Sequence, residues 1–397
     1  MSSKGKRVAI VGYGSTSMNP PFQPKKSWKE FVAEAVYEAI GSTRNIEPRQ
    51  LQVGCIGYHG EGVSEFGGIG PTVSDLLAIS PNPVYAVSGN CTSGAIALNM
   101  ACAFIRSEQA ELVFAAGYDK DSDHMNYPEV INLSTEADYD YEFGFTHADY
   151  FAMCEAYYMR KYKYGPDILA RFAYDQHWYA RRNPRAALYG QPMPTIEQLL
   201  RMGGGLFATR AEGCAAVILA SEENAHKYTD KPIFIDGISY KCMSQYMGHH
   251  ARFNELRYPG TDELDMSVTG LTIPTKDEAF KMAGITAKDI NLATVYDAGA
   301  TSIMQLEALG LFPYGEGGKA VLEGGISVNG RCPTNTDGGN MGRGHSSGGD
   351  GLFQVMECAI QLRGEAGERQ VPKPKIAVCH DVGGIVAHCT VVVLGNQ

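Results

Sequence analysis

A weak internal repeat limits how this chain can fold more than any other feature. In the first half, CTSG at 91–94 opens a helical stretch, and the strand-like run LVFAAG follows it. In the second half, HSSG at 345–348 opens the helical stretch GLFQVMECAIQLRG, and KIAVC follows. If the halves are duplicates related by a pseudo-twofold axis, the two helix starts meet near that axis. Cys91 would then face His345, and an imidazole beside a thiol is what an activated cysteine nucleophile needs.

The local pattern around Cys91 gives the same indication independently. VYAVSG before it has the β-branched and aromatic character of a short buried strand. After it, Ile96, Met100 and Phe104 recur at helical spacing. Cys91 is therefore expected at a strand-to-helix junction, where the helix dipole and free N–H groups favour a thiolate. The alternative is a buried structural cysteine, which is how we interpret the other nine.

Composition excludes several classes of function. The chain has 397 residues and a net charge of -10, which gives no electrostatic support for binding nucleic acid or anionic membranes. No apolar run is long enough to cross a membrane and no signal peptide precedes RVAIVGYG, so we expect a cytoplasmic protein. The ten cysteines include no CxxC pair, and His249-His250 has no third ligand at metal spacing. We therefore expect no metal and interpret that histidine pair as surface.

Strand-like and helical runs alternate along the chain, which predicts an α/β fold with covered sheets. The repeat divides the chain into an N-terminal half over 1–230 and a C-terminal half over 231–397. The stretch at about 120–210 is dense in tyrosine, phenylalanine and acidic residues. We expect it to form a largely helical insertion that packs over the core near the site.

These motifs resemble those of the thiolase superfamily over essentially the whole chain. NCTSG looks like its nucleophile motif, and GRGHSSGGDG looks like its histidine loop. Within the superfamily, the chain resembles the thiolase-like catalytic subunits of bacterial monoacetylphloroglucinol acetyltransferases. That resemblance is carried by GYHGEGVSEFGGIGPTVSDLLAISP, DYDYEFGFTHAD, NAHKYTDKP, AGITAKDI and NTDGGNMGRGHSSGGDG.

The resemblance implies a five-layered αβαβα fold made of two pseudo-symmetric halves. It implies acyl transfer through a thioester on Cys91, with His345 as the base that deprotonates the thiol. No cofactor is implied. The implied assembly contains a homodimeric core, a second thiolase-like (HMG-CoA-synthase-like) subunit and a small zinc-ribbon/OB-fold subunit.

Two departures from the thiolase pattern bear on the reaction. Where thiolases usually carry a second cysteine as acid/base, this chain reads CHDVGG and places Asp381; the glycine register matches neither Cys379 nor Cys389. Where thiolases place an oxyanion-binding asparagine, this chain reads VYDAG and places Tyr296, whose phenol can donate one hydrogen bond. Both departures fit a site for a different carbon nucleophile, such as an electron-rich phenolic ring.

Further residues are expected near the reacting groups. The resemblance implies that His59, His147 and Tyr127 surround the acceptor pocket, although a lone histidine is more often structural. The other candidates have adequate structural alternatives as helix-capping or turn residues, and these are Ser347, Asp350 and Asp381. The backbone N–H of Gly383 is expected to contribute to oxyanion binding.

The leading expectation is a C-acyltransferase that moves an acyl group, most simply acetyl, to a phenolic acceptor without coenzyme A. One alternative is a thiolase that acts on a β-ketoacyl-CoA with a zinc-ribbon/OB-fold partner. Arg160, Lys161, Arg181 and Arg182 would then meet the CoA phosphates, or they form a solvated face. Another alternative is a noncatalytic scaffold subunit, although a scaffold would need neither Cys91 nor His345.

Overall fold

A computed structural model describes residues 6–60, 67–123, 132, 134–202, 208–250, 270–297 and 301–396. Within these ranges, nine strands form one sheet in the order β3-β2-β4-β5-β1-β6-β9-β8-β7. The strands are β1 (Val8–Ser15), β2 (Val53–Tyr58), β3 (Val84–Val87), β4 (Leu112–Asp119), β5 (Gly213–Ser221), β6 (Ile233–Cys242), β7 (Leu292–Val295), β8 (Ile376–Gly383) and β9 (His388–Gly395). The first five belong to the N-terminal half and the last four to the C-terminal half. The antiparallel pairing of β1 with β6 joins the two groups.

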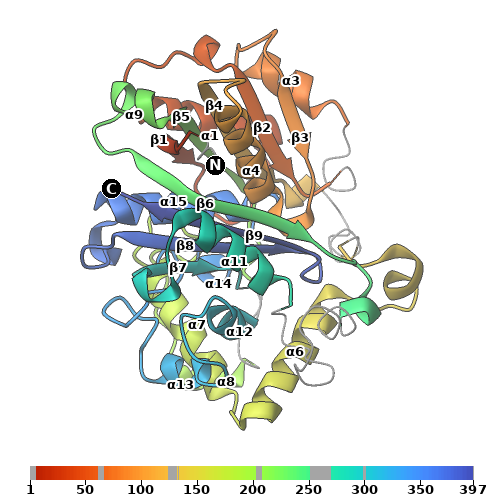
Figure 1. The fold of residues 1–397 in the computed structure, drawn as a ribbon. Helices are drawn as coiled ribbons and strands as arrows, with labels where there is room; N and C mark the ends of the chain where they lie inside the picture. Colours follow the sequence, from red (N-terminus) through yellow and green to blue (C-terminus); the bar gives the residue numbers. More distant parts are fainter. Residues whose placement is uncertain are drawn as a thin grey trace.

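The two halves of the sheet enclose a central layer of helices, and further helices cover the outer face of each half. Helices and strands thus alternate in five layers (Figure 1). The helix α4 (Ser93–Arg106) and the helix α15 (Asp350–Arg363) form the middle layer, and a shared apolar core packs them against strands of both halves. On one outer side lie α1 (Trp28–Gly41), α3 (Ile69–Leu76) and α9 (Glu222–Tyr228), and on the other α11 (Thr272–Ala283) and α12 (Thr301–Ala308). The structure confirms the predicted α/β class and the αβαβα layering.

The remaining elements are mostly short. The insertion contributes the helices α6 (His147–Tyr162), α7 (Asp167–Ala180) and α8 (Ile196–Arg201), and the π-helical turn η4 (Ala137–Tyr141). Its described part is therefore largely helical, as predicted. The C-terminal half adds α13 (Gly317–Leu322) and α14 (Gly339–Gly342). Single 3-10 turns are η1 (Pro48–Gln50), η2 (Asn90–Thr92), η3 (Asp121–Asp123), η5 (Ala287–Asp289) and η6 (Gly367–Arg369). Among the described residues, no helix is both long and apolar enough to cross a membrane.

The strand β3 differs from the prediction of a buried strand. It forms the edge of the sheet and pairs only with β2 among the described strands, and Tyr85 on it is 43% exposed. The Tyr85 ring stacks on Phe104 of α4, with centroids 5.2 Å apart. The β-branched and aromatic composition of VYAV fits either a buried strand or a half-covered edge, so the pattern alone could not distinguish them.

Glycine allows the central helices to approach the sheet closely. A Cβ atom on Gly348 would collide with the carbonyl oxygen of Tyr118 at the end of β4. A Cβ atom on Gly117 would collide with the Gly348 carbonyl. The turn before α15 therefore packs directly on the end of β4, and this contact fixes where the His345 loop lies.

Candidate active site

Cys91 lies in the 3-10 turn η2, between β3 and the first turn of α4. The preceding residue, Asn90, has φ 55, a left-handed conformation that asparagine tolerates better than most residues. Ser93 fixes the turn, because its Oγ accepts a hydrogen bond from the Gly89 N–H (2.9 Å) and donates one to the Asn90 carbonyl (2.6 Å). The thiol is thus held at a helix start and is 4% exposed.

The structure brings the two halves of the repeat together at this point. Cys91 Sγ lies 3.8 Å from His345 Nε2. The backbone of His345 is held on both sides, because its N–H donates to the Thr209 carbonyl (2.7 Å) and its carbonyl accepts from the Ala211 N–H (3.1 Å). The two helix starts therefore form one site, as the internal repeat predicts.

A buried carboxylate orients the imidazole. Asp350, the first residue of α15, hydrogen-bonds His345 Nδ1 through Oδ2. Its other oxygen accepts from Arg343 Nη2 at 3.0 Å, and Arg343 Nη1 donates to Asp337 at 2.8 Å. Because Asp350 occupies Nδ1, the ring directs Nε2 toward the thiol. Of the two roles weighed for Asp350, the geometry favours that of orienting a neighbour.

These contacts decide the charge state of the Cys91 thiol. Burial by itself raises the pKa of Cys91, but hydrogen bonds and charges from His345 and His59 outweigh it and lower the pKa to about 6. Burial lowers the pKa of His345, while the charge and hydrogen bond of Asp350 raise it well above its usual value. The resting pair at neutral pH is therefore a thiolate and an imidazolium.

Two further histidines lie at this site, and their pKa values shift in opposite directions. His59, just after β2, bonds Ser134 Oγ through Nε2 (3.0 Å), and its contact with Cys91 raises its pKa despite burial. His147 begins α6; burial and the charges of His345 and His59 lower its pKa to about 4, so the ring is neutral. His147 Nδ1 is buried, and no hydrogen-bond partner for it is found among the described residues.

Tyr296 follows β7 and faces the same thiol. Its ring centroid lies 5.8 Å from that of His345, in an edge-on arrangement, and 6.2 Å from that of Phe151. Burial, followed by the charges of Cys91 and Asp350, raises its pKa well above the usual value. The phenol is therefore neutral and can donate its proton in a hydrogen bond.

The other candidates surround this centre. Ser347 Oγ lies 3.4 Å from His345 Nε2. Asp381, 2% exposed, interacts with Thr92 beside Cys91, and Gln354 Nε2 lies 3.5 Å from its Oδ1. Burial raises the pKa of Asp381 well above its usual value, and the charges of Asp350 and Cys91 act in the same direction. Gly383 lies against the Gly89 carbonyl at the turn before Cys91, where a side chain would collide.

Two further expectations concern Tyr127 and the pair His249-His250. Tyr127 lies outside the described residues. The surface assignment of the histidine pair is wrong for His250, which is buried, with Nδ1 3.1 Å from the Tyr150 hydroxyl and Nε2 2.7 Å from the Ser244 carbonyl. His249 is exposed. His250 therefore helps to hold α6 through Tyr150, whereas His249 lies at the surface.

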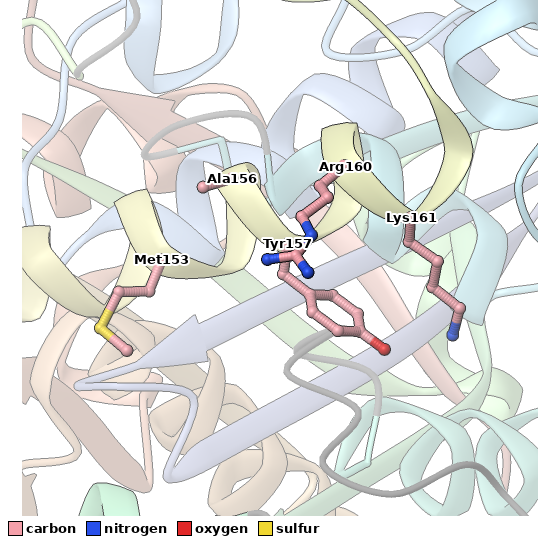
Figure 2. A pocket seen from close by; sticks show the side chains of 5 residues that line it. All are labelled: Met153, Ala156, Tyr157, Arg160 and Lys161. Carbon is pink, nitrogen blue, oxygen red and sulfur yellow. The ribbon is translucent and has the colours of Figure 1, made fainter.

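The four basic residues weighed for CoA phosphates divide into two pairs. Arg181 donates to the Pro192 carbonyl (2.9 Å), and Arg182 stacks on Trp178, with its guanidinium carbon 4.0 Å from the ring centroid. Arg160 and Lys161 instead line a hollow of about 480 Å³ on α6 (Figure 2). Met153, Ala156 and Tyr157 of the same helix also line it.

Sequence reasoning missed part of the polar network behind the site. Arg343, Asp337, Asn340 and Asp297 are buried and bonded to one another or to Asp350. The available signal was a lone arginine two residues before His345 in a glycine-rich loop, since a buried arginine requires paired carboxylates.

Family models match one segment in each half of the chain. The model described as Thiolase C-terminal domain-like matches residues 262–396, and the model of the Beta-ketoacyl synthase, N-terminal domain, matches residues 80–141. The chain is 30% identical over 387 residues to an acetyl-CoA acetyltransferase of Methanothermobacter thermautotrophicus, covering 95% of this chain and 96% of that protein. It is 26% identical to sterol carrier protein 2 of Bos taurus, covering 95% of this chain and 70% of the relative.

Solved structures share the fold over their whole length. The Ltp2-ChsH2(DUF35) aldolase superposes with a TM-score of 0.79 at 20% identity, covering 100% of this chain and 99% of that one. Human mitochondrial 3-ketoacyl-CoA thiolase gives a TM-score of 0.70 at 18% identity, covering 99% of each chain. The layered architecture with paired central helices is thus a thiolase-like fold. With the sequence relationship above, the chain belongs to the thiolase superfamily and is an enzyme of that group.

Proposed function

We propose that this enzyme transfers an acyl group, most simply acetyl, between carbon atoms through a thioester on Cys91. The proposed acceptor is a phenolic ring of the phloroglucinol type, and coenzyme A takes no part. The observation that carries this proposal is the make-up of the site: one thiolate, three histidines and a phenol, with the buried carboxyl of Asp381 beside Thr92.

The two cysteines near Asp381 in sequence have contacts of their own. Cys379 Sγ lies 3.5 Å from Cys358 Sγ, and Cys389 Sγ lies 3.9 Å from Thr272 Oγ1. Neither bond involves Cys91. This arrangement argues against a two-cysteine thiolase mechanism and supports one in which a histidine moves the protons.

Each step then has a residue to perform it. The Cys91 thiolate adds to the donor ketone carbon, and the Tyr296 hydroxyl donates to the resulting oxyanion. The bond between the acyl carbon and the donor ring breaks, and the ring carbon takes a proton from the His345 imidazolium. The acceptor ring carbon next attacks the thioester, Cys91 leaves as thiolate, and the proton lost from that ring carbon returns to His345.

Partners form part of the proposal. The Ltp2-ChsH2(DUF35) aldolase supports a partner subunit of the DUF35 type. In the proposed complex, this partner takes the role of the small zinc-ribbon/OB-fold subunit. We further propose a homodimeric core and a second thiolase-like subunit. The exposed edge strand β3, whose outer backbone groups are unpaired within the described chain, supports self-association.

Intact-protein mass spectrometry tests the reaction. After mixing with acetylphloroglucinol, the protein should gain one acetyl group, and phloroglucinol should be released. Cys91→Ala should gain none. Conversely, rapid acetylation by acetyl-CoA with none from the phenolic ketone would favour the rival function, a CoA-dependent thiolase. That rival is supported by the acetyl-CoA acetyltransferase of Methanothermobacter thermautotrophicus.

A further inference from the structure

The residues on either side of Tyr296 are hydrogen-bonded to the loop that carries His345. On the near side, the Val295 N–H donates to Asn335 Oδ1 (2.7 Å), and Asn335 Nδ2 donates to the Val295 carbonyl (3.0 Å). On the far side, Asp297 accepts from two backbone N–H groups, of Asn340 (2.7 Å to Oδ1) and Met341 (3.3 Å to Oδ2). Tyr296 therefore lies between two attachment points on one segment, residues 335–341.

Asp297 is enclosed at its attachment point. It is 1% exposed, and a Cβ atom on Gly339 would collide with its Oδ2. Gly339 has φ 56 and thereby allows the backbone to approach the carboxylate. A carboxylate that accepts two N–H bonds in so small a space has little freedom to move, and neither has the residue before it.

The same segment continues to the nucleophile's base. Two residues after Met341 lies Arg343, whose Nη2 donates to Asn340 Oδ1 (2.5 Å) and to Asp350 Oδ1 (3.0 Å). Asp350 in turn bonds His345. One stretch of chain thus fixes both the imidazole, through Arg343 and Asp350, and the phenol, through Asn335 and Asp297.

We propose that Asp297 is a positioning residue that holds the Tyr296 hydroxyl in line with the Cys91 thioester carbonyl. The proposal rests on the oxyanion-donor role of Tyr296 in the proposed function. Asp297 touches none of the reacting atoms in this role. Without its two acceptor bonds, the end of β7 loses one of its two side-chain attachments to the 335–341 segment and is held beyond Val295 mainly by the Tyr296 N–H bond to the His380 carbonyl (3.0 Å). The hydroxyl then loses its fixed distance from the developing charge.

Two probes separate positioning from general disruption. Acylation of Cys91 by p-nitrophenyl acetate passes through an oxyanion and releases p-nitrophenolate, so its rate reports on Tyr296. Alkylation of Cys91 by iodoacetamide forms no oxyanion, and its rate reports on the thiolate and on His345. Neither probe requires the natural donor, so a failure of phenolic acylation would leave this test intact.

Asp297→Asn keeps the size of the side chain but offers an amide N–H to one of the two backbone donors. We expect acylation by p-nitrophenyl acetate to slow by roughly 10- to 100-fold, the loss expected for a misplaced group. Alkylation by iodoacetamide should be unchanged. In the Tyr296→Phe background, the same change should cost less than about 2-fold, because no hydroxyl remains to be positioned.

Two further variants complete the test. Asn335→Gly removes the attachment of Val295, and glycine adopts the φ of 52 at this position without strain. We expect slower acylation and unchanged alkylation in this variant too. It therefore tests the positioning role even if Asp297→Asn does not fold. Asp175→Asn, which alters a buried carboxylate bonded to Arg171 on α7, should leave both probes unchanged.

The outcomes distinguish the positioning role of Asp297 from the donor role of Tyr296. If Tyr296→Phe slows acylation but both Asp297→Asn and Asn335→Gly do not, the positioning role is wrong and the donor role stands. Equal losses in the wild-type and Tyr296→Phe backgrounds would also overturn it, as would parallel losses of acylation and alkylation. If Tyr296→Phe itself has no effect, both the donor role and the positioning role fail.

Discussion

Arg343 Nη2 lies 3.0 Å from Asp350 Oδ1, while the other oxygen of the same carboxylate bonds His345 Nδ1. Both charged side chains are buried, at 3% and 0% exposure. The buried Arg343 guanidinium thus holds the Asp350 carboxylate, and this carboxylate orients the His345 imidazole toward the Cys91 thiol. Because an unpaired charge in this interior is costly, each member of the chain keeps the next in its ionised form.

Asp350→Asn should remove the negative charge that stabilises the His345 imidazolium while keeping the size of the side chain. The amide cannot favour the imidazolium, so we expect a lower pKa for His345 and a higher one for Cys91. In the Ser-His-Asp triad the equivalent change costs roughly 10⁴-fold in turnover, and a loss of at least about 100-fold is expected here. Rates of acylation by p-nitrophenyl acetate at pH 7 measure it. Asp289→Asn, at an exposed turn, serves as the control; a normal rate in Asp350→Asn would contradict this role of Asp350.

His345→Ala should move the titration of Cys91 upward. The wild-type thiol has a pKa of about 6, so its thiolate forms as the pH rises through that value. Without the imidazolium, burial dominates, and the thiolate forms only at higher pH. The measurement is the pH dependence of alkylation by iodoacetamide. Identical midpoints for the two proteins would mean that His345 does not act on this thiol.

His59 and His147 should differ in the same assay. His59 lowers the pKa of Cys91, whereas His147, whose own pKa is about 4, carries no charge at neutral pH. We therefore expect His59→Asn to raise the alkylation midpoint and His147→Asn to leave it in place. His147→Asn should instead weaken binding of the acceptor, seen as a higher KM. A shift of the midpoint in both variants would show that His147 is charged after all.

The contact between Cys91 and His345 could be predicted from the sequence because the two residues occupy equivalent places in the internal repeat. Cys91 and His345 open equivalent helices, so the pseudo-symmetry of the halves predicted a contact between residues 254 positions apart. The α/β class with covered sheets followed from the alternation of strands and helices, and the five-layered arrangement followed from the resemblance to thiolases. Neither inference needed the details of side-chain packing.

The supporting network was not accessible in the same way. Asp297, Asn335 and Arg343 are polar residues in glycine-rich loops, where exposure is the usual expectation. Their burial depends on how the 335–345 segment folds against β7 and α15, which is a tertiary property. The same limit explains His250 and β3, whose burial is decided by what packs against them rather than by their own composition.

Tyr296→Phe is the sharpest single test of the proposed chemistry. The change removes one hydroxyl and keeps the ring, which packs edge-on against His345 and beside Phe151. Loss of one oxyanion donor typically raises the barrier by about 2.7–4 kcal/mol, or roughly 100- to 1000-fold in rate. We expect that loss in acyl transfer, with little change in the thermal midpoint of unfolding. Both quantities should be measured on one preparation. A variant that retains more than about half of the wild-type rate lies outside the range for a lost donor, and Tyr296 would then be a core aromatic residue.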